Sequence, residues 1–206
     1  DQAISSFPVT SLYRAYVSSG SSIKKVLIAT NGDRIFYSTK DISPEWIKVS
    51  TGYSQQHWQH TVMNNKVIMT GDVLTDPIKQ FDVVTGSMSD LLASDGTTNS
   101  IVLRAKYILN SSNYLLTANV QDISLIGNTT QYYPNRMYYS LLLIPSSMTP
   151  QRYIGIPEGG GEITGIGEQN RFVHVFTAEN IFELQFSVLN CQGCAGLSGD
   201  QAVTQI

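Results

Sequence analysis

The chain has 206 residues and a net charge of −3, with 42% hydrophobic and only 14% charged residues. This length fits one domain, or part of a larger one, with a sizeable core. The acidic balance argues against a large nucleic-acid footprint, and no apolar run approaches the roughly 18 residues of a membrane helix. Because charged groups lose water when they are covered, this composition favours a protein packed among neighbours.

Short β-branched and aromatic runs, separated by Gly, Asn, Asp and Pro, predict strands along the whole chain. In chain order they cover residues 12–17, 25–30, 34–38, 47–50, 58–63, 66–70, 79–82, 103–109, 114–120, 136–140, 152–156, 163–167, 172–177 and 181–186. The pairs Asn31-Gly32 and Asn64-Asn65 supply the positive φ that tight hairpins need. Residues 178–180 link the last two strands.

The chain repeats itself loosely, at a spacing of about one hundred residues. The segment RIFYS at 34–38 recurs as RMYYS at 136–140, and NKVIMT at 65–70 recurs as NRFVHV at 170–175. Repeated short strands bury their apolar faces by stacking on one another. A propeller blade takes roughly 40–50 residues, so the spacing equals about two blades and the chain would hold about four.

The sequence therefore predicts an all-β, β-propeller-like fold built from short antiparallel strands, as a single partial domain spanning 1–206. A sandwich or a barrel is the alternative. An open arc of about four blades leaves strand edges exposed, so we expect closure by more sequence or by neighbouring chains. A short helical turn is predicted at 87–94. Because no initiator Met or signal-peptide pattern is present, we expect a processed product or the ordered part of something longer.

The order of the motifs resembles that of β-propeller virion proteins of tailed bacteriophages, over nearly the whole chain. The matching segments are 13–16 (YRAY), 27–30 (LIAT), 35–37 (IFY), 46 (W), 51–52 (TG), 76–77 (DP), 80–82 (QFD), 85–86 (TG), 105–108 (AKYI), 114–119 (YLLTAN), 134–140 (PNRMYYS), 161–166 (GEITGI), 175–177 (VFT), 180–184 (NIFEL) and 193–194 (GC). The region from 105 to 140 is the most specific. The loop 141–150 departs from the family, since it is apolar where acidic turns are expected.

This resemblance implies a structural protein of the phage tail, of nozzle or hub type, in a ring around the DNA exit path. The implied partners are other tail and connector proteins, further copies of the chain, and genomic DNA that passes without sequence-specific binding. The implied location is the virion, assembled in the host cytoplasm. The family pattern is a packing pattern, so it implies no enzyme activity and no catalytic, cofactor-binding or metal-binding residues. A mildly acidic channel would repel the phosphate backbone rather than hold it.

The cysteines and histidines are the residues that could bind a metal ion or carry out redox chemistry. Cys191 and Cys194 have the spacing of a redox dithiol or half a zinc site, but no second ligand pair lies nearby in sequence, which favours small thiols in a turn. His57 and His60 lie three apart on a predicted strand and so point to opposite faces, which argues against one shared metal. His174 reads as a packed residue within a strand.

The alternative function is a carbohydrate-binding or glycan-cleaving propeller, of the tail-spike or sialidase-like type. The segment 38–41 (STKD), followed by Trp46, resembles an aspartate box without its glycine. A glycosidase needs two carboxyl groups roughly 5–9.5 Å apart. The acidic candidates are scattered: Asp72, Asp76, Asp82, Asp122, Glu158 and Glu162.

Two further patterns carry no clear function. The glycine-rich stretch 159–167 lacks a phosphate-binding pattern, and the glycosylation patterns at Asn110 and Asn128 would be chance matches in a phage protein. A third hypothesis is a monomeric interaction scaffold.

Overall fold

A computed structural model describes residues 8–19, 21–40, 43–54, 57–71, 74–94, 100–124, 129–149, 152–156, 161–185 and 203–205, and in these ranges the chain is all-β. Its strands form four antiparallel sheets, each a meander of strands that follow one another in the chain. The all-β prediction is confirmed. We call the sheets 1 to 4 in chain order.

Sheets 1 and 2 hold four strands each. Sheet 1 contains β1 (Val9–Ser19), β2 (Ser22–Asn31), β3 (Arg34–Ser38) and β4 (Ile47–Thr51). Sheet 2 contains β5 (Trp58–Met63), β6 (Lys66–Gly71), β7 (Lys79–Asp82) and β8 (Ser87–Asp90).

Sheet 3 has five strands and sheet 4 has four. Sheet 3 contains β9 (Leu92–Ser94), β10 (Ser100–Ser111), β11 (Tyr114–Ser124), β12 (Thr130–Tyr139) and β13 (Tyr153–Gly155), with the 3-10 turn η1 (Pro145–Ser147) between its last two strands. Sheet 4 contains β14 (Ile163–Gln169), β15 (Phe172–Thr177), β16 (Ile181–Gln185) and β17 (Val203–Gln205).

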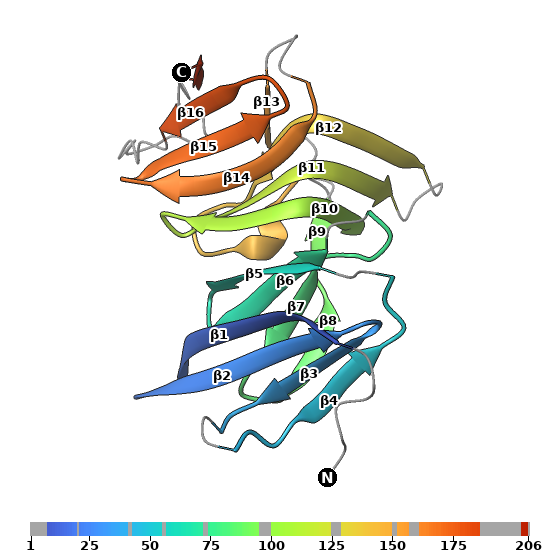
Figure 1. Ribbon diagram of the computed structural model, residues 1–206. Coiled ribbons are helices and arrows are strands. Elements are labelled where there is room, and N and C mark those ends of the chain that lie inside the picture. Colours follow the sequence, from blue (N-terminus) through green and yellow to red (C-terminus); the bar gives the residue numbers. More distant parts are fainter. Residues whose placement is uncertain are drawn as a thin grey trace.

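The sheets are stacked in chain order, from sheet 1 near the N-terminus to sheet 4 near the C-terminus (Figure 1). Strand β1 lies against β5, and β4 lies against β8. Strand β10 contacts β5 and β6 on one side and β14 on the other. Sheets 2 and 3 are therefore covered on both faces, whereas each end sheet has one face against a neighbour.

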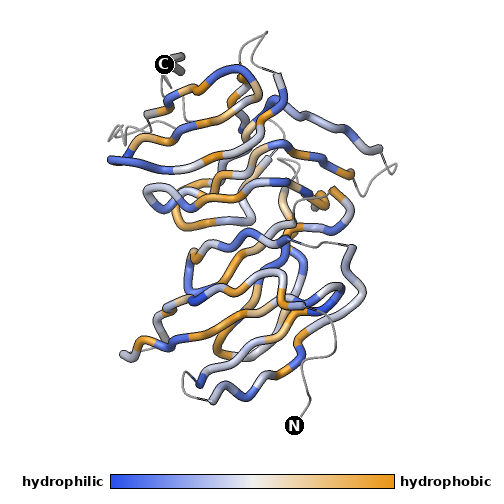
Figure 2. The backbone as a smooth tube through the Cα atoms, in the orientation of Figure 1, coloured by the Kyte–Doolittle hydropathy of each residue, from blue (hydrophilic) through white to orange (hydrophobic). Residues whose placement is uncertain are grey.

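Three apolar clusters fill the spaces between successive sheets, and apolar stretches accordingly run through the inner strands (Figure 2). In β6, Val67 and Met69 belong to the cluster between sheets 1 and 2, while Ile68 belongs to the next cluster. Leu115 and Leu116 of β11 divide in the same way between the last two clusters. Because side chains alternate along a strand, an inner strand needs apolar residues at successive positions.

All fourteen predicted strands are present, and Arg34–Ser38, Trp58–Met63, Lys79–Asp82 and Phe172–Thr177 have the predicted bounds. The largest error is at the start of β12, which begins six residues before the prediction. Pro134 lies within these added residues, and a proline cannot donate a ladder hydrogen bond. Its place is a bulge: the pairing skips from Ala118↔Met137 to Val120↔Tyr133, so no ladder bond from Pro134 is required.

The predicted helical turn at 87–94 is wrong, because this segment forms β8 and β9. Gly86, with φ of 68°, closes a hairpin that pairs β8 with β7. Leu91 and Ala93 are buried while Leu92 is 44% exposed, which is the alternation of a strand. Pairing within the sheet has overridden the local capping signal.

The hairpin predictions hold with one shift. Asn64 and Asn65 have φ of 48° and 60°, as a type I′ turn requires. In the first hairpin the turn residues are Gly32 (φ 56°) and Asp33, one position later than predicted. The Asn64-Asn65 turn precedes β6 in sheet 2, and a similar turn at 170–171 precedes β15 in sheet 4. The sequence repeat thus spans two sheets.

Candidate functional site

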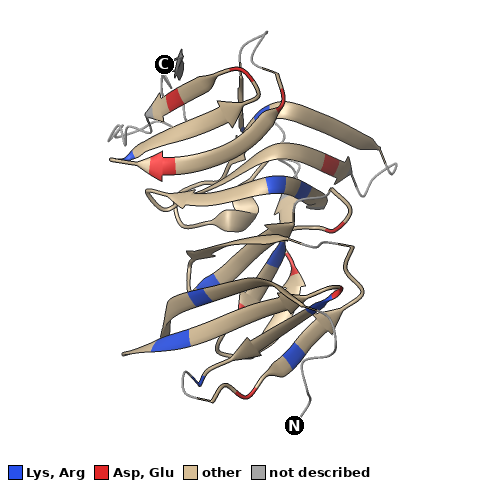
Figure 3. Ribbon diagram, viewed as in Figure 1, with Lys and Arg blue, Asp and Glu red and all other residues tan. Residues whose placement is uncertain are grey.

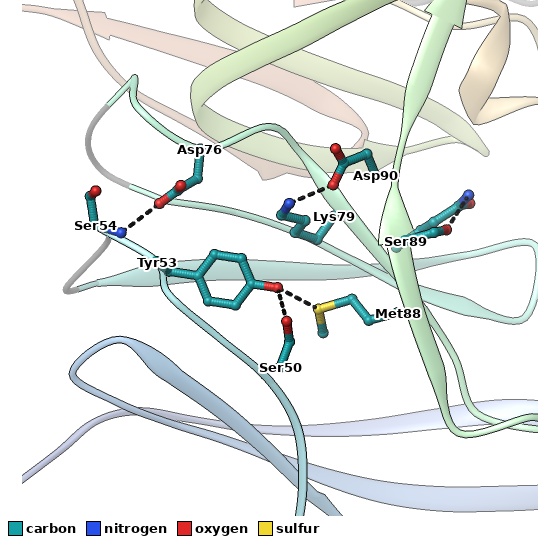
Figure 4. A network of polar contacts seen from close by, with 9 residues as sticks. Ser50, Tyr53, Ser54, Asp76, Lys79, Met88, Ser89 and Asp90 are labelled. Carbon is teal, nitrogen blue, oxygen red and sulfur yellow. Dashed lines mark hydrogen bonds and ion pairs between the residues drawn. The ribbon is translucent and has the colours of Figure 1, made fainter.

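Several of the polar side chains that the structure brings together link neighbouring sheets. Between sheets 1 and 2, Tyr53 follows β4 and donates its hydroxyl to Ser50 Oγ at 2.6 Å (Figure 4). The same oxygen lies 3.5 Å from Met88 Sδ in β8. Lys79 Nζ of β7 lies 2.5 Å from Asp90 Oδ1 and 5.1 Å from the centre of the Tyr53 ring.

Lys79 is only 9% exposed, so its ammonium has lost most of its water. The carboxylate of Asp90 and the face of the Tyr53 ring replace part of that hydration. Register decides this meeting, since Lys79 and Asp90 are directly opposite each other in the β7–β8 pair. The network ties the strand ends of sheet 2 to the segment that leaves sheet 1.

His60 of β5 lies half-buried in the same interface. Its ring is stacked on Tyr13 of β1, with centroids 4.8 Å apart and planes 9° from parallel. Its Nε2 atom is buried without a hydrogen-bond partner among the described residues. Burial disfavours the imidazolium and lowers the pKa of His60 from 6.5 to about 4. Burial also raises the pKa of Tyr13. The stacked pair is therefore neutral at physiological pH.

Between sheets 2 and 3, polar side chains bond to the backbone of the neighbouring sheet. Asn110 Nδ2 donates to Val62 O at 2.7 Å, and the Ile108 N–H donates to Gln59 Oε1 at 3.2 Å. The hydroxyl of Thr70 donates to the Ala105 carbonyl. These bonds fix how β10 is seated against sheet 2. Asn110 thus has a packing contact, which the glycosylation pattern had not suggested.

Between sheets 3 and 4, Glu162 is the centre of a cluster. Its Oε1 accepts hydrogen bonds from Lys106 Nζ at 2.7 Å, Asn119 Nδ2 at 2.6 Å and the Tyr132 hydroxyl at 3.3 Å. Asn119 also donates to the Ile163 carbonyl at 3.0 Å. The hydrogen bonds from Lys106 and Asn119 are the main causes that lower the pKa of Glu162. Glu162 is therefore ionised, and its hydrogen bonds hold the start of β14 against sheet 3.

Asn119 reaches this position because its backbone is unusual. It is fully buried at the bulge of β11 and has φ of 56°, in the left-handed region that Asn tolerates better than most residues. The bulge turns the amide out of the regular alternation and toward sheet 4.

An arginine lies between two tyrosine rings at the β12–β13 edge of sheet 3. The guanidinium carbon of Arg136 is 3.9 Å from the Tyr133 ring centre and 4.1 Å from that of Tyr153. Tyr138 of the same strand is fully buried and donates to Asp122 Oδ2 at 2.9 Å. Burial raises the pKa of Asp122, against the opposing effect of that hydrogen bond.

The residues considered from sequence are dispersed. Cys191, Cys194, Asp72, Glu158, Asn128 and part of the glycine-rich stretch lie outside the described residues. His57 is exposed before β5, His60 is half-buried in β5, and His174 Nε2 lies 3.4 Å from Glu183 in sheet 4. In the described ranges no group of three or more His, Cys, Asp and Glu could hold a metal ion.

The described acidic candidates have separate partners. Asp76 accepts from the Ser54 N–H at 2.8 Å, and Asp82 accepts from the Val84 N–H at 2.8 Å in the β7–β8 turn. Ser38, the first residue of the box-like segment, is buried and bonds the backbone of Lys40, which is a turn contact. One hollow, of about 310 Å³, is lined by Lys24, Lys25, Thr39 and Val83.

Sequence reasoning did not assign roles to Lys79, Asn119 or Arg136. Their partners lie across a pair or across a sheet interface, so no local pattern points to them. A weak signal was available for Asn119, because Asn is an unusual residue inside the apolar run of β11. None of the helical segments in the described part of the chain is long and apolar enough to cross a membrane.

The described residues thus define an all-β protein in which some polar side chains link stacked sheets. No family model and no curated protein matches the sequence. Among solved structures, the chain is similar to the extracellular domain of a hybrid two-component system from B. thetaiotaomicron, at 9% identity and a TM-score of 0.38. The match covers 86% of this chain and 29% of that one, so this chain spans less than a third of it.

Proposed function

We propose that this chain is a structural component of a bacteriophage tail, of nozzle or hub type, forming a ring around the DNA exit path. The observation that carries the proposal is the stack of four antiparallel sheets, each a local meander, in chain order. This is how successive blades of a propeller-like arc follow one another. The motif resemblance to phage propeller proteins supplies the virion context.

The polar contacts support a mechanical role. The hydrogen bonds between Asn119 and Glu162, and between Asn119 and the Ile163 carbonyl, join sheet 3 to the start of sheet 4. A component that transmits load benefits from sheets that cannot slide, and side-chain bonds across each interface resist sliding. The net charge of −3 suits a channel wall that DNA passes without being held.

The test is location and copy number in intact particles. Cryo-electron microscopy of virions from the source phage, with the map fitted by this chain, is expected to place a ring of copies at the tail. Light scattering on the purified chain is expected to give a multiple of 22.7 kDa. Particles whose tail density fits no copy of this chain would overturn the virion assignment.

A second candidate, a carbohydrate-binding propeller, is favoured by the aromatic edge of sheet 3. Tyr132 and Tyr153 are 45% and 42% exposed, and Arg136 holds the Tyr153 ring in place. Exposed aromatic rings offer flat apolar faces to a ligand. On a glycan array, Tyr153→Ala should lose any sugar that the unaltered chain binds, while Tyr16→Ala, at an exposed tyrosine in sheet 1, should keep it. An array without signal removes this candidate.

A further inference from the structure

Each end sheet has an outward face on which large apolar side chains are exposed. In sheet 1 the exposed part is β1 and the start of β2, because further along the same face Leu27, Ala29 and Phe36 are buried. In β1, Ala15 and Val17 pack against sheet 2, so the alternate residues Leu12 and Tyr16 point away from it. Leu12 is 65% exposed and Tyr16 is 58% exposed. Ile23, at the start of β2, is 75% exposed. Large apolar side chains at these exposures, gathered on one pair of strands, are typical of an interaction surface.

Sheet 4 has a corresponding surface. Val173 and Val175 of β15 pack against sheet 3, so Phe176 points outward, with Ile181 directly opposite it in β16. Phe176 is 39% exposed and Ile181 is 42% exposed. The ring of Phe176 lies over β14, where a Cβ on Gly165 would meet the ring at 3.6 Å. The absence of a side chain at Gly165 therefore leaves this surface flat.

The two end sheets carry opposite charge (Figure 3). Among the described residues from 8 to 54, the cations are Arg14, Lys24, Lys25, Arg34, Lys40 and Lys48, against the carboxylates Asp33 and Glu45. Among residues 161–185, the carboxylates are Glu162, Glu168, Glu179 and Glu183, against the single cation Arg171. On the outward faces themselves, register places Arg14 and Lys25 beside Tyr16 in sheet 1. In sheet 4 it places Glu183 beside Ile181 and opposite His174, whose Nε2 lies 3.4 Å from the carboxylate.

We propose that the occupant of each face is a second copy of this chain, so that sheet 1 of one copy packs on sheet 4 of the next. This inference rests on the proposed function, because it names the surfaces through which the ring would close. Two copies joined through the same face would bring like charges together, which disfavours a symmetric dimer. The head-to-tail contact pairs a cationic apolar face with an acidic apolar face, and such contacts close into rings when the rotation allows.

The decisive experiment uses one variant for each face. Leu12→Glu places an anion on the cationic face of sheet 1, and Ile181→Lys places a cation on the acidic face of sheet 4. Each variant alone is expected to sediment near the monomer mass of 22.7 kDa, with self-association about tenfold weaker or more. Mixed in equal amounts, they should form a dimer of one copy of each, because each keeps the face that the other has lost.

Matched controls are Val84→Glu and Val84→Lys, since Val84 is 58% exposed in the β7–β8 turn and belongs to neither face. Both controls should assemble like the unaltered chain, and circular dichroism should show all four variants folded. Raising the salt concentration should weaken the assembly, because the attraction between the faces is screened.

The outcomes separate this proposal from the proposed function. A mixture that stays monomeric, or single variants that assemble normally, overturns the head-to-tail contact. An unaltered chain that is monomeric at every concentration tested also overturns self-docking and indicates a different protein on these faces. If particles show a tail ring whose contacts lie elsewhere, the virion role stands and this inference fails. If the heterodimer forms but virions lack the chain, this inference stands and the virion role fails.

Discussion

The interface between sheets 1 and 2 and the interface between sheets 3 and 4 stabilise buried polar groups in different ways. In the first, the half-buried ring of His60 is stacked on Tyr13 and is neutral. In the second, Glu162 stays at the rim, with its side chain 48% exposed, and shares its charge among three donors. The first interface depends on a histidine that must stay unprotonated, because its buried nitrogen has no hydrogen-bond partner among the described residues. The second depends on a carboxylate that accepts three hydrogen bonds.

The apolar parts of the two interfaces also differ. Aliphatic residues make up most of both clusters, but between sheets 1 and 2 aromatic rings also meet in pairs: Phe81 meets Tyr37 with ring centres 4.9 Å apart, and Trp58 meets Tyr53 at 5.3 Å. Between sheets 3 and 4 the buried residues include many aliphatic ones, among them Leu116 and Val175. Large rings leave large cavities when they are truncated, so the first interface should be most sensitive to substitutions at its paired rings, such as Phe81.

The largest effect should come from the core. Phe81→Ala should lower the free energy of unfolding by about 3–5 kcal/mol, and Leu116→Ala by about 2–5 kcal/mol, because both side chains are fully buried. Urea unfolding would be followed by tryptophan fluorescence, since Trp46 and Trp58 both lie in the N-terminal half, and by circular dichroism for the whole chain.

These two probes test whether the interfaces are one cooperative unit. If the stack unfolds as one unit, both variants shift the two signals together. If Leu116→Ala leaves the fluorescence transition in place, the two interfaces unfold separately. Val84→Ala, at an exposed turn residue, is the control and should change stability by less than about 0.5 kcal/mol.

The next effect concerns acid. Below pH 6.5 the unfolded chain protonates His60, whereas the folded chain does not until pH is about 4. Stability should therefore fall as pH drops from 6.5 to about 4, by up to about 3 kcal/mol from this residue. His60→Phe keeps a ring on Tyr13 and removes the titration, so its stability should stay flatter across that window.

The measurement is the urea midpoint at closely spaced pH values. His57→Gln changes an exposed neighbour and should reproduce the pH profile of the unaltered chain. A His60→Phe variant with the same pH profile as the unaltered chain would show that the acid response lies elsewhere.

The third prediction concerns the bulge. Asn119→Ala removes both bonds to sheet 4 and also puts a strained residue at φ of 56°, so it should cost about 2–3 kcal/mol. Asn119→Gly removes the same bonds but relieves the backbone strain, and should cost about 1 kcal/mol less. Thermal unfolding distinguishes the two. Equal losses for both variants would indicate that the side-chain bonds alone matter at this position.

The smallest effect should come from the rim. Glu162→Gln keeps the shape of the side chain but removes the charge facing Lys106, and should cost about 0.5–1 kcal/mol because the site is half-exposed. The pKa of Glu162 is lowered, so its contribution is present above pH 4.5 and is lost as pH falls through the folded pKa. The variant and the unaltered chain should therefore converge below pH 4.5 and differ above it.

Much of the fold could be read from local signals. Alternation and β-branched residues placed fourteen strands, and paired asparagines such as Asn64-Asn65 placed a hairpin, because these preferences act between near neighbours in the chain. The helical turn predicted at 87–94 is wrong because β8 pairs with β7 and β9 pairs with β10, and this pairing outweighs a serine cap. The contacts of the candidate site could not be predicted from sequence. Glu162 contacts residues that lie 43 and 56 positions away in the chain, and no spacing rule reaches that far.

By itself, the sequence determined that this protein is made of short strands, where most of them begin and end, and that its surface holds few charges. Only the tertiary structure decided which faces are covered. Burial depends on the stacking order of the sheets, which puts Val67 and Ile68 into different clusters and leaves Leu12 and Ile181 outward. A side chain's alternation fixes on which side of its sheet it lies, but only packing fixes what it meets there.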